Sequence, residues 1–191
     1  SECLVGSEMC IRDRIYPPTL TNSDLANIKI AKEMGVTGVM QPFVRDHSDL
    51  ECVKEALREA GAEDIRLFAK IENMDGVRKL EELLPAADEI VIARGDLGNS
   101  VHLWDLPGVQ RQISEKCRAA GKPFMVVTQM LASMERSPVP TRAEVNDIFH
   151  AVMDGAASIM VTGETAVGDY PVEVIRYMVN TVRSAEKEEN R

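Results

Sequence analysis

Two short segments place a cation and a carboxylate two residues apart where an apolar run ends: Lys70 with Glu72, and Arg94 with Asp96. Side chains alternate along a strand, so the two members of each pair are predicted to project from one face. Glu72 and Asp96 suit a hard cation such as Mg²⁺, which prefers oxygen ligands and leaves positions for substrate oxygens. The alternative is a set of interior ion pairs, Lys70 with Asp96 and Arg94 with Glu72.

Hydroxyls and a further carboxylate end two later apolar runs. Thr128 lies in TQM at 128–130, and Thr162 and Glu164 lie in TGET at 162–165. A hydroxyl there can bind a substrate oxygen or a relay water, but it can equally cap the next helix, and the residues alone leave both roles open. Gly95 and Gly98 in RGDLG let backbone amides approach an anion closely.

Five short segments that end in these polar residues are predicted to be parallel strands. Each is apolar for four or five residues and then becomes polar; they cover residues 36–43, 65–72, 89–96, 123–130 and 158–165. Amphipathic helices are expected between them, with N-terminal signals at Ser48, Pro107, Thr141 and Pro171 and ends at Gly35, Gly61, Gly121 and Gly155. This alternation indicates an α/β fold with a parallel sheet covered by helices.

Two finer expectations concern the helices. In the helix after Thr141, spacings of three and four predict one buried stripe, made of Val145, Ile148, Phe149 and Val152. Cys52 and Cys117 are each expected to be small buried hydrophobic residues on a helix.

The spacing of the strands distinguishes the two main α/β architectures. Equivalent points lie 27, 26, 33 and 35 residues apart, at Phe43, Lys70, Asp96, Gln129 and Glu164. Eight such units amount to roughly 250 residues, the usual size of a (β/α)₈ TIM barrel. No G-x-G-x-x-G follows any strand, which argues against a Rossmann sheet. We therefore predict a (β/α)₈ barrel of which residues 15–191 supply about the last five units, preceded by a non-native or disordered leader at 1–14.

Composition excludes several classes of function. The chain has 22 Lys and Arg against 31 Asp and Glu, a net charge of −9, and 4% aromatic residues, so we expect no nucleic-acid partner. Its longest apolar runs, at 89–93 and 124–127, are far below the roughly 20 residues of a membrane span. The four cysteines lack metal-ligand spacing, which favours a reducing, cytoplasmic location.

Several motifs together closely resemble pyruvate kinase. They run in order from about residue 16 to residue 191: KIEN at 70–73, ARGDLG at 93–98, GKP at 121–123, TQML at 128–131, PTRAEVND at 140–147, DGA at 154–156 and TGETAVGDYP at 162–171. The resemblance implies phosphoryl transfer between phosphoenolpyruvate and ADP, giving pyruvate and ATP in glycolysis. It also implies Mg²⁺ (or Mn²⁺) and K⁺ as cofactors, and a homo-oligomer, a tetramer, for the complete cytoplasmic protein.

The resemblance also assigns roles at the substrate. Glu72 and Asp96 match the Mg²⁺ ligands, and Lys70 matches the lysine that stabilises charge on the phosphoryl group and the enolate. The backbone amides of Gly95 and Asp96 are expected to bind the substrate carboxylate, with Thr128 beside it. Such fixed charges suit phosphoryl transfer, in which positioning and electrostatic stabilisation do most of the catalysis.

Three further residues belong to the implied catalytic set. Arg94 supports the arrangement around the substrate. Thr162 and Glu164 match a hydroxyl and a carboxylate near the route that protonates the enolate carbon, with Thr162 in place of the more usual serine.

The chain also departs from the family pattern. Its first three barrel units, its lid domain and its C-terminal domain have no counterpart in these 191 residues. Pro42 stands where the family usually has a serine close to the monovalent-cation site, and NSVHLWDLPG at 99–108 replaces the usual acidic residue and proline. Two alternatives therefore stay open: an inactive truncated half-barrel, and a Mg²⁺-dependent lyase or aldolase acting on a pyruvate enolate.

Overall fold

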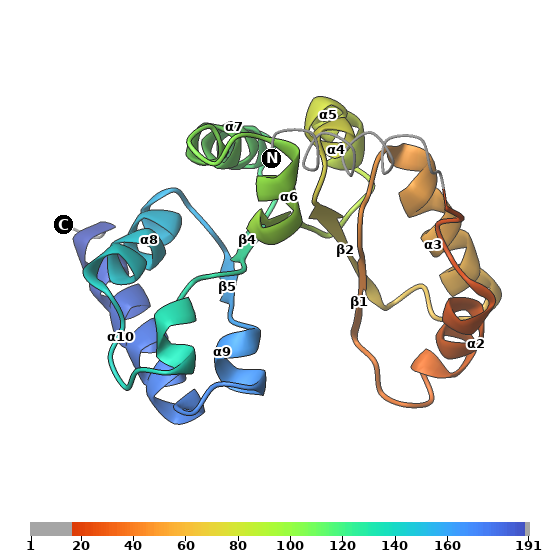
Figure 1. Cartoon of the computed structure of the whole chain (residues 1–191). Helices are drawn as coiled ribbons and strands as arrows, with labels where there is room; N and C mark the ends of the chain where they lie inside the picture. The colour runs from red at the N-terminus through yellow and green to blue at the C-terminus, as the bar shows by residue number, and fades with distance from the viewer. Residues whose placement is uncertain (1–16, 190–191) are drawn as a thin grey trace, which may run out of the picture.

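The computed structural model describes residues 17–189, which contain one sheet of five parallel strands (Figure 1). The strands are β1 (Gly38–Gln41), β2 (Arg66–Ile71), β3 (Glu89–Ala93), β4 (Phe124–Val127) and β5 (Ser158–Met160). They pair in chain order, β1-β2-β3-β4-β5. A doubly wound sheet reverses its strand order at a switch point, whereas a (β/α)₈ barrel adds each strand beside the previous one. The predicted α/β class and partial barrel are therefore confirmed.

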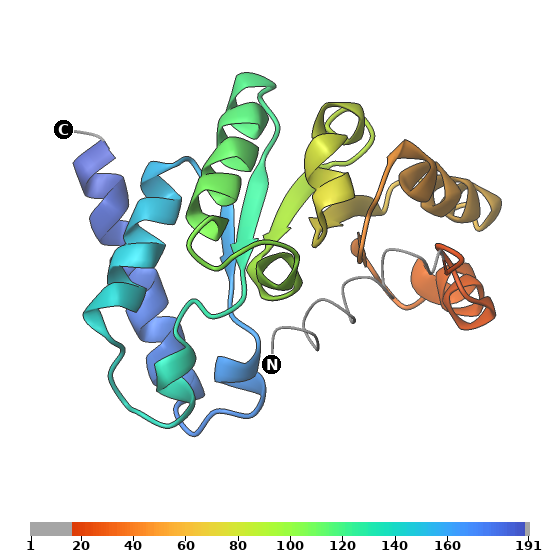
Figure 2. The same ribbon diagram turned by 45° about the horizontal axis from the view of Figure 1, so that its top comes forward.

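Helices occupy every connection between the strands. They are α2 (Asn22–Ala31), α3 (His47–Glu59), α4 (Met74–Arg78), α5 (Leu80–Leu83), α6 (Arg94–Ser100), α7 (Leu106–Ala119), the 3₁₀ helix η1 (Ala132–Glu135), α8 (Arg142–Met153), α9 (Gly163–Ala166) and α10 (Pro171–Glu189). In Figure 2 the helices follow one another along an arc, from α2 in orange-red to α10 in blue. The last two long helices, α8 and α10, pack against each other.

The strands are shorter than the apolar pattern predicts, and this changes how the site is built. Strand β3 ends at Ala93, and Arg94 already begins helix α6. The predicted alternation holds for Lys70 within β2 but fails for Arg94 and Asp96, which lie in the first turn of a helix. The prediction that Arg94 and Asp96 project from one face of a strand is therefore wrong, because a helical turn and not a strand pleat sets their directions.

Most of the predicted helix boundaries are confirmed. Thr141 and Glu144 form a capping box at the start of α8, and Pro107 and Pro171 lie in first turns. The four predicted terminal glycines all have a positive φ: Gly35, Gly61, Gly121 and Gly155. Ser48 is not a cap, however, because Asp46 precedes α3 and accepts a hydrogen bond from the Ser48 backbone N–H.

The core has two parts, one on each face of the sheet. The larger part lies between the strands and the helices and includes Leu50, Leu83, Ile113 and Ile148. The smaller part lies on the other face and consists of Val91, Ala93 and Val127, with Phe68, Met125 and Met160 packed against them. This second cluster fills the side on which a barrel encloses its interior.

The predicted buried stripe of α8 needs correction. On α8 the buried residues are Ile148, Ala151 and Val152, whereas Val145 and Phe149 are half-buried and line a surface groove with Tyr177 of α10. Ile148 and Ala151 belong to the large core, whereas Val145 and Phe149 lie toward α10, against which α8 packs, and stay partly open in the groove there.

The two cysteines within 17–189 behave differently from each other. Cys117 is buried, as predicted, and its burial raises the pKa of the thiol to about 12. Cys52 is exposed, which contradicts the prediction, because it lies on the outer side of α3 while Leu50 and Val53 face the core. The expected leader at 1–14, with the other two cysteines, lies outside the described residues. Among residues 17–189, no helix combines the length and apolar character needed to cross a membrane.

Candidate active site at the carboxyl ends of the strands

Lys70 and Glu72 lie side by side where β2 ends. Lys70 Nζ is 2.8 Å from Glu72 Oε1, and the Glu72 side chain is only 3% exposed. The second carboxylate oxygen of Glu72 accepts a hydrogen bond of 2.7 Å from the backbone N–H of Phe43, which follows β1. Glu72 is thus paired with Lys70 and not with Arg94, so that part of the ion-pair alternative is wrong.

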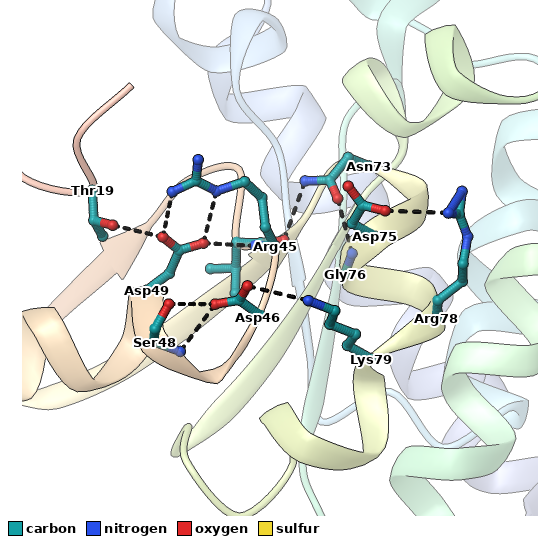
Figure 3. Close-up of polar contacts among 11 residues, drawn as sticks. Thr19, Arg45, Asp46, Ser48, Asp49, Asn73, Asp75, Gly76, Arg78 and Lys79 are labelled. Atoms are coloured by element: carbon teal, nitrogen blue, oxygen red, sulfur yellow. Dashed lines mark hydrogen bonds and ion pairs between the residues drawn. The ribbon is translucent and has the colours of Figure 1, made fainter. Parts of the chain in front are cut away.

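The loop after β1 is tied to the loop after β2 (Figure 3). Asn73 donates a hydrogen bond to the carbonyl of Val44, and its side-chain oxygen accepts one from the Gly76 N–H. Phe43 has a φ of 51°, a left-handed conformation that is costly for a residue with a bulky side chain. The contacts of Asn73 help to hold this strained loop in the position from which Phe43 binds Glu72.

Gly76 must be glycine for the two loops to meet, which gives a first testable prediction. A Cβ at this position would lie 2.6 Å from the Val44 carbonyl oxygen, a backbone atom. We expect Gly76→Ala to separate the loops and to lower stability by about 1–3 kcal/mol, as overpacking does. Gly108→Ala in α7 meets nothing within 4 Å and should instead stabilise by up to about 1 kcal/mol. Urea unfolding of both variants checks this, and equal effects would contradict the steric argument.

Asp49 anchors the β1 loop from α3 and makes stability depend on pH. Burial alone would raise the pKa of this carboxyl, but hydrogen bonds from Arg45 and Thr19 outweigh it, so the pKa is lowered (Figure 3). A carboxylate whose pKa is lowered by folding stabilises the protein above its unfolded pKa of about 4 and loses that contribution as the pH falls through the folded pKa.

We therefore expect Asp49→Asn to cost about 2 kcal/mol at pH 7, the range of charge-assisted hydrogen bonds, and progressively less below pH 4. Urea unfolding at pH 7 and pH 3.5 measures the difference. Asp64→Asn is the control, because the Lys32–Asp64 pair is exposed and its loss should leave the unfolding midpoint unchanged. A difference for Asp49→Asn that stays constant with pH would contradict this account.

The first turn of α6 brings Gly95 and Asp96 to the end of the strand next to β2. Ile71 of β2 pairs with Ile92 of β3, so Glu72 and the start of α6 follow adjacent positions in the sheet. Gly95 lies against Thr128, since a Cβ built on Gly95 would be 3.5 Å from Thr128 Cγ2. The structure thus brings together the end of β2, the start of α6 and the end of β4.

Arg94 points away from Glu72 and toward α8. Its guanidinium donates hydrogen bonds to both carboxylate oxygens of Asp147 at 2.8 and 2.7 Å, and to the backbone carbonyl of Thr128 at 2.8 Å. The side chain is 12% exposed.

The capping alternative for the two threonines is wrong. The Thr128 hydroxyl donates to the carbonyl of Val127 at 2.6 Å, and Thr162 makes no side-chain capping bond to α9. Glu164 is buried and accepts hydrogen bonds from the backbone N–H groups of Thr162 and Leu131. Its carboxylate therefore joins the start of α9 to the segment after β4.

The residues present fit a divalent cation held in part by substrate. Within 17–189, no three His, Cys, Asp or Glu side chains converge on one metal-sized site. Glu72 after β2 and Asp96 in the first turn of α6 offer two hard oxygen donors, which could hold a divalent cation and leave its other positions for water or substrate. The donor chemistry suits Mg²⁺ or Mn²⁺ shared with an oxygen-rich substrate.

Three residues at the site carry roles that sequence reasoning did not assign: Phe43, Asn73 and Asp147. Asn73 and Asp147 both lie inside motifs that the sequence analysis singles out, KIEN and PTRAEVND. The signal that could have identified them is a polar side chain inside a motif at a strand end or on a helix. Phe43 acts through its backbone, for which its side chain gives no signal.

Comparisons with known proteins agree with this geometry. A family model described as pyruvate kinase, barrel domain, matches residues 10–175. A pyruvate kinase of Bacillus licheniformis is 42% identical over 170 residues, which are 89% of this chain and 29% of that protein. A pyruvate kinase of Dictyostelium discoideum is 43% identical over 169 residues, which are 88% of this chain and 33% of that protein. A pyruvate kinase of Clostridium acetobutylicum is 39% identical over 176 residues, which are 92% of this chain and 37% of that protein. The chain thus spans about a third of the length of the curated relatives it matches.

Proposed function

Because the chain belongs to the pyruvate kinase family, we propose that it carries the part of the catalytic barrel that transfers a phosphoryl group from phosphoenolpyruvate to ADP. One observation carries the proposal: the Lys70 ammonium lies 2.8 Å from the buried Glu72 carboxylate, at a strand end next to the helix that bears Asp96. A fixed cation beside oxygen donors for a metal is the arrangement that phosphoryl transfer requires.

Each residue has a distinct task in this proposal. Glu72 and Asp96 would hold Mg²⁺ or Mn²⁺, which supplies charge neutralisation at the substrate oxygens when bound. Lys70 stabilises negative charge that develops on the phosphoryl group and on the enolate. The amides of Gly95 and Asp96 orient the substrate carboxylate, and Thr128 borders that position because it packs against Gly95.

The Thr162 hydroxyl is assigned to the route that protonates the enolate carbon: it passes on one proton and takes up another from solvent water, so that it ends as a hydroxyl. Thr162 is exposed, whereas the Glu164 carboxylate is buried and already accepts two backbone N–H groups. Glu164 therefore acts as a positioning residue, which holds Thr162 and the segment after β4 in place. On the family resemblance we also propose a K⁺ requirement, a cytoplasmic location and a homo-oligomeric complete enzyme; Pro42 implies a changed environment near the K⁺ site.

A chimera provides the direct test. Five strands do not close a barrel, so residues 17–189 are placed in the Bacillus licheniformis pyruvate kinase instead of its matching segment. We expect the folded chimera to form ATP only when phosphoenolpyruvate, ADP and a divalent cation are all supplied. A folded chimera that forms no ATP but cleaves 2-oxo acids without nucleotide would favour the lyase alternative. The 191-residue chain, assayed alongside, tests whether the half-barrel is inactive by itself.

A further inference from the structure

Two consecutive residues after β4 have left-handed backbones without being glycine. Thr128 has a φ of 73° and Gln129 a φ of 53°. Non-glycine residues avoid this region, and such strain persists only where surrounding contacts enforce it. The strained peptide unit joins the Thr128 carbonyl to the Gln129 N–H, and the Thr128 side chain that it orients lies against Gly95.

Arg94 makes the contact that fixes this peptide unit. Its Nη2 donates to the Thr128 carbonyl oxygen at 2.8 Å and also lies 2.8 Å from Met130 Sδ. A guanidinium is planar, so aligning Nη1 with an anion also orients Nη2. The orientation of the 128–129 peptide therefore depends on what holds the other end of the guanidinium.

Asp147 on α8 holds that other end. Both of its oxygens accept from Arg94 Nη1, at 2.8 and 2.7 Å, while Gln110 of α7 lies at a marginal 3.5 Å. Helix α8 is itself fixed to the same segment of chain, because Glu144 accepts hydrogen bonds from the backbone N–H and the hydroxyl of Ser133. Helix α8 is thus linked to the segment after β4 by two contacts, one from Glu144 to Ser133 and one from Asp147 through Arg94 to Thr128.

We propose that Asp147 is a positioning residue for the substrate-carboxylate site: it acts through Arg94 to fix the strained Thr128–Gln129 peptide and thereby holds the Thr128 side chain against Gly95. This inference rests on the proposed function for its consequence, since Thr128 and Gly95 border the substrate carboxylate there. A purely structural Arg94–Asp147 bridge would add stability without setting the Thr128 backbone. Loss of the Asp147 charge changes the Thr128 backbone conformation only if Asp147 is a positioning residue, whereas it lowers stability in either role.

A ligand-free measurement tests the mechanical part. In the labelled 191-residue chain, backbone couplings and ¹³C shifts report the left-handed conformations of Thr128 and Gln129. We expect Asp147→Asn to produce a second, non-left-handed population at these residues, and Asp147→Glu to restore much of the original signature. Asp169→Asn is the matched control, because the Arg136–Asp169 pair is exposed and lies outside the proposed site. Unchanged signals at Thr128 and Gln129 in Asp147→Asn would overturn the proposal.

A double-mutant cycle tests the functional part. Oxalate, a planar dianion resembling the enolate of pyruvate, is titrated into the chimera with Mg²⁺ present. We expect Asp147→Asn to weaken oxalate binding about tenfold, since small misplacements of positioned groups cost up to about 100-fold. In a Thr128→Ala background the same change should have little further effect, because the Thr128 side-chain atoms that the peptide positions against Gly95 have gone.

The outcomes separate the two proposals. Additive losses in the cycle would assign Asp147 a role independent of Thr128 and overturn the inference. Absence of any oxalate binding to the unsubstituted chimera would count against the proposed substrate site, while the backbone measurement would still decide the role of Asp147.

Discussion

Glu72→Gln is expected to abolish phosphoenolpyruvate-dependent ATP formation while leaving the fold intact. Glutamine retains an oxygen that can accept the hydrogen bond from the Phe43 N–H, so the strained loop after β1 keeps its partner. It removes the negative charge that would bind a divalent cation and that now faces Lys70. We expect turnover of the chimera to fall by about 1,000-fold or more, the upper range for loss of one group that stabilises transition-state charge.

Two measurements check this effect. The first is the turnover rate at saturating Mg²⁺, and the second is the affinity for Mn²⁺, followed by electron paramagnetic resonance. Glu89→Gln is the matched control, because Glu89 is also a buried glutamate with a cationic partner, Arg66, and a hydroxyl partner, Ser158. Glu89 begins β3 and therefore lies at the amino end of the strands, away from the site. Its substitution should lower stability without removing turnover. Equal losses of turnover in both variants would mean that Glu72 acts through the fold and not through a metal.

The part of the site within a regular element could be predicted from the sequence. Lys70 lies in β2, and Glu72 is the first residue after that strand. Their spacing of two residues correctly predicts that both side chains project from the same face. The strand order also agrees with the spacing, which is that of barrel units, and with the absence of a G-x-G-x-x-G motif after any strand. Both predictions rest on local periodicity, which the sequence contains in full.

The directions of Arg94 and Asp96 could not be predicted in the same way. Whether the pleat continues past Ala93 depends on where the helix begins, and α6 begins without a side-chain cap. The partner of Arg94 is 53 residues away in sequence. Contacts over that distance follow from how α8 packs, and no local pattern near Arg94 encodes them.

The backbone contribution of Phe43 is a further limit of sequence reasoning. A phenylalanine gives no indication of a left-handed φ, since glycine and asparagine are the residues that usually signal it. The conformation is enforced by the loop after β2, through Asn73 and the absence of a side chain at Gly76. Strained residues of this kind are where local rules are expected to fail, because the site requires them.

Lys70→Met should have opposite effects on turnover and on metal binding. The Lys70 ammonium now occupies one side of the Glu72 carboxylate, at 2.8 Å, and repels any cation that Glu72 binds. Its removal frees that carboxylate, so we expect Mn²⁺ to bind several-fold more tightly. Turnover should nevertheless fall by about 100-fold or more, because the charge that develops on the substrate loses its fixed counter-charge.

Parallel Mn²⁺ titration and turnover of the chimera distinguish this role from a structural one. Lys122→Met is the control, because Lys122 precedes β4 at the opposite end of the strands and donates to the Ala87 carbonyl. It should change neither metal affinity nor turnover, although it lowers stability. If Lys70→Met keeps near-normal turnover, the lysine serves only to neutralise Glu72. If it loses turnover and metal binding together, Glu72 depends on Lys70 for its position, and the two residues form one unit that cannot be divided into a metal ligand and a charge stabiliser.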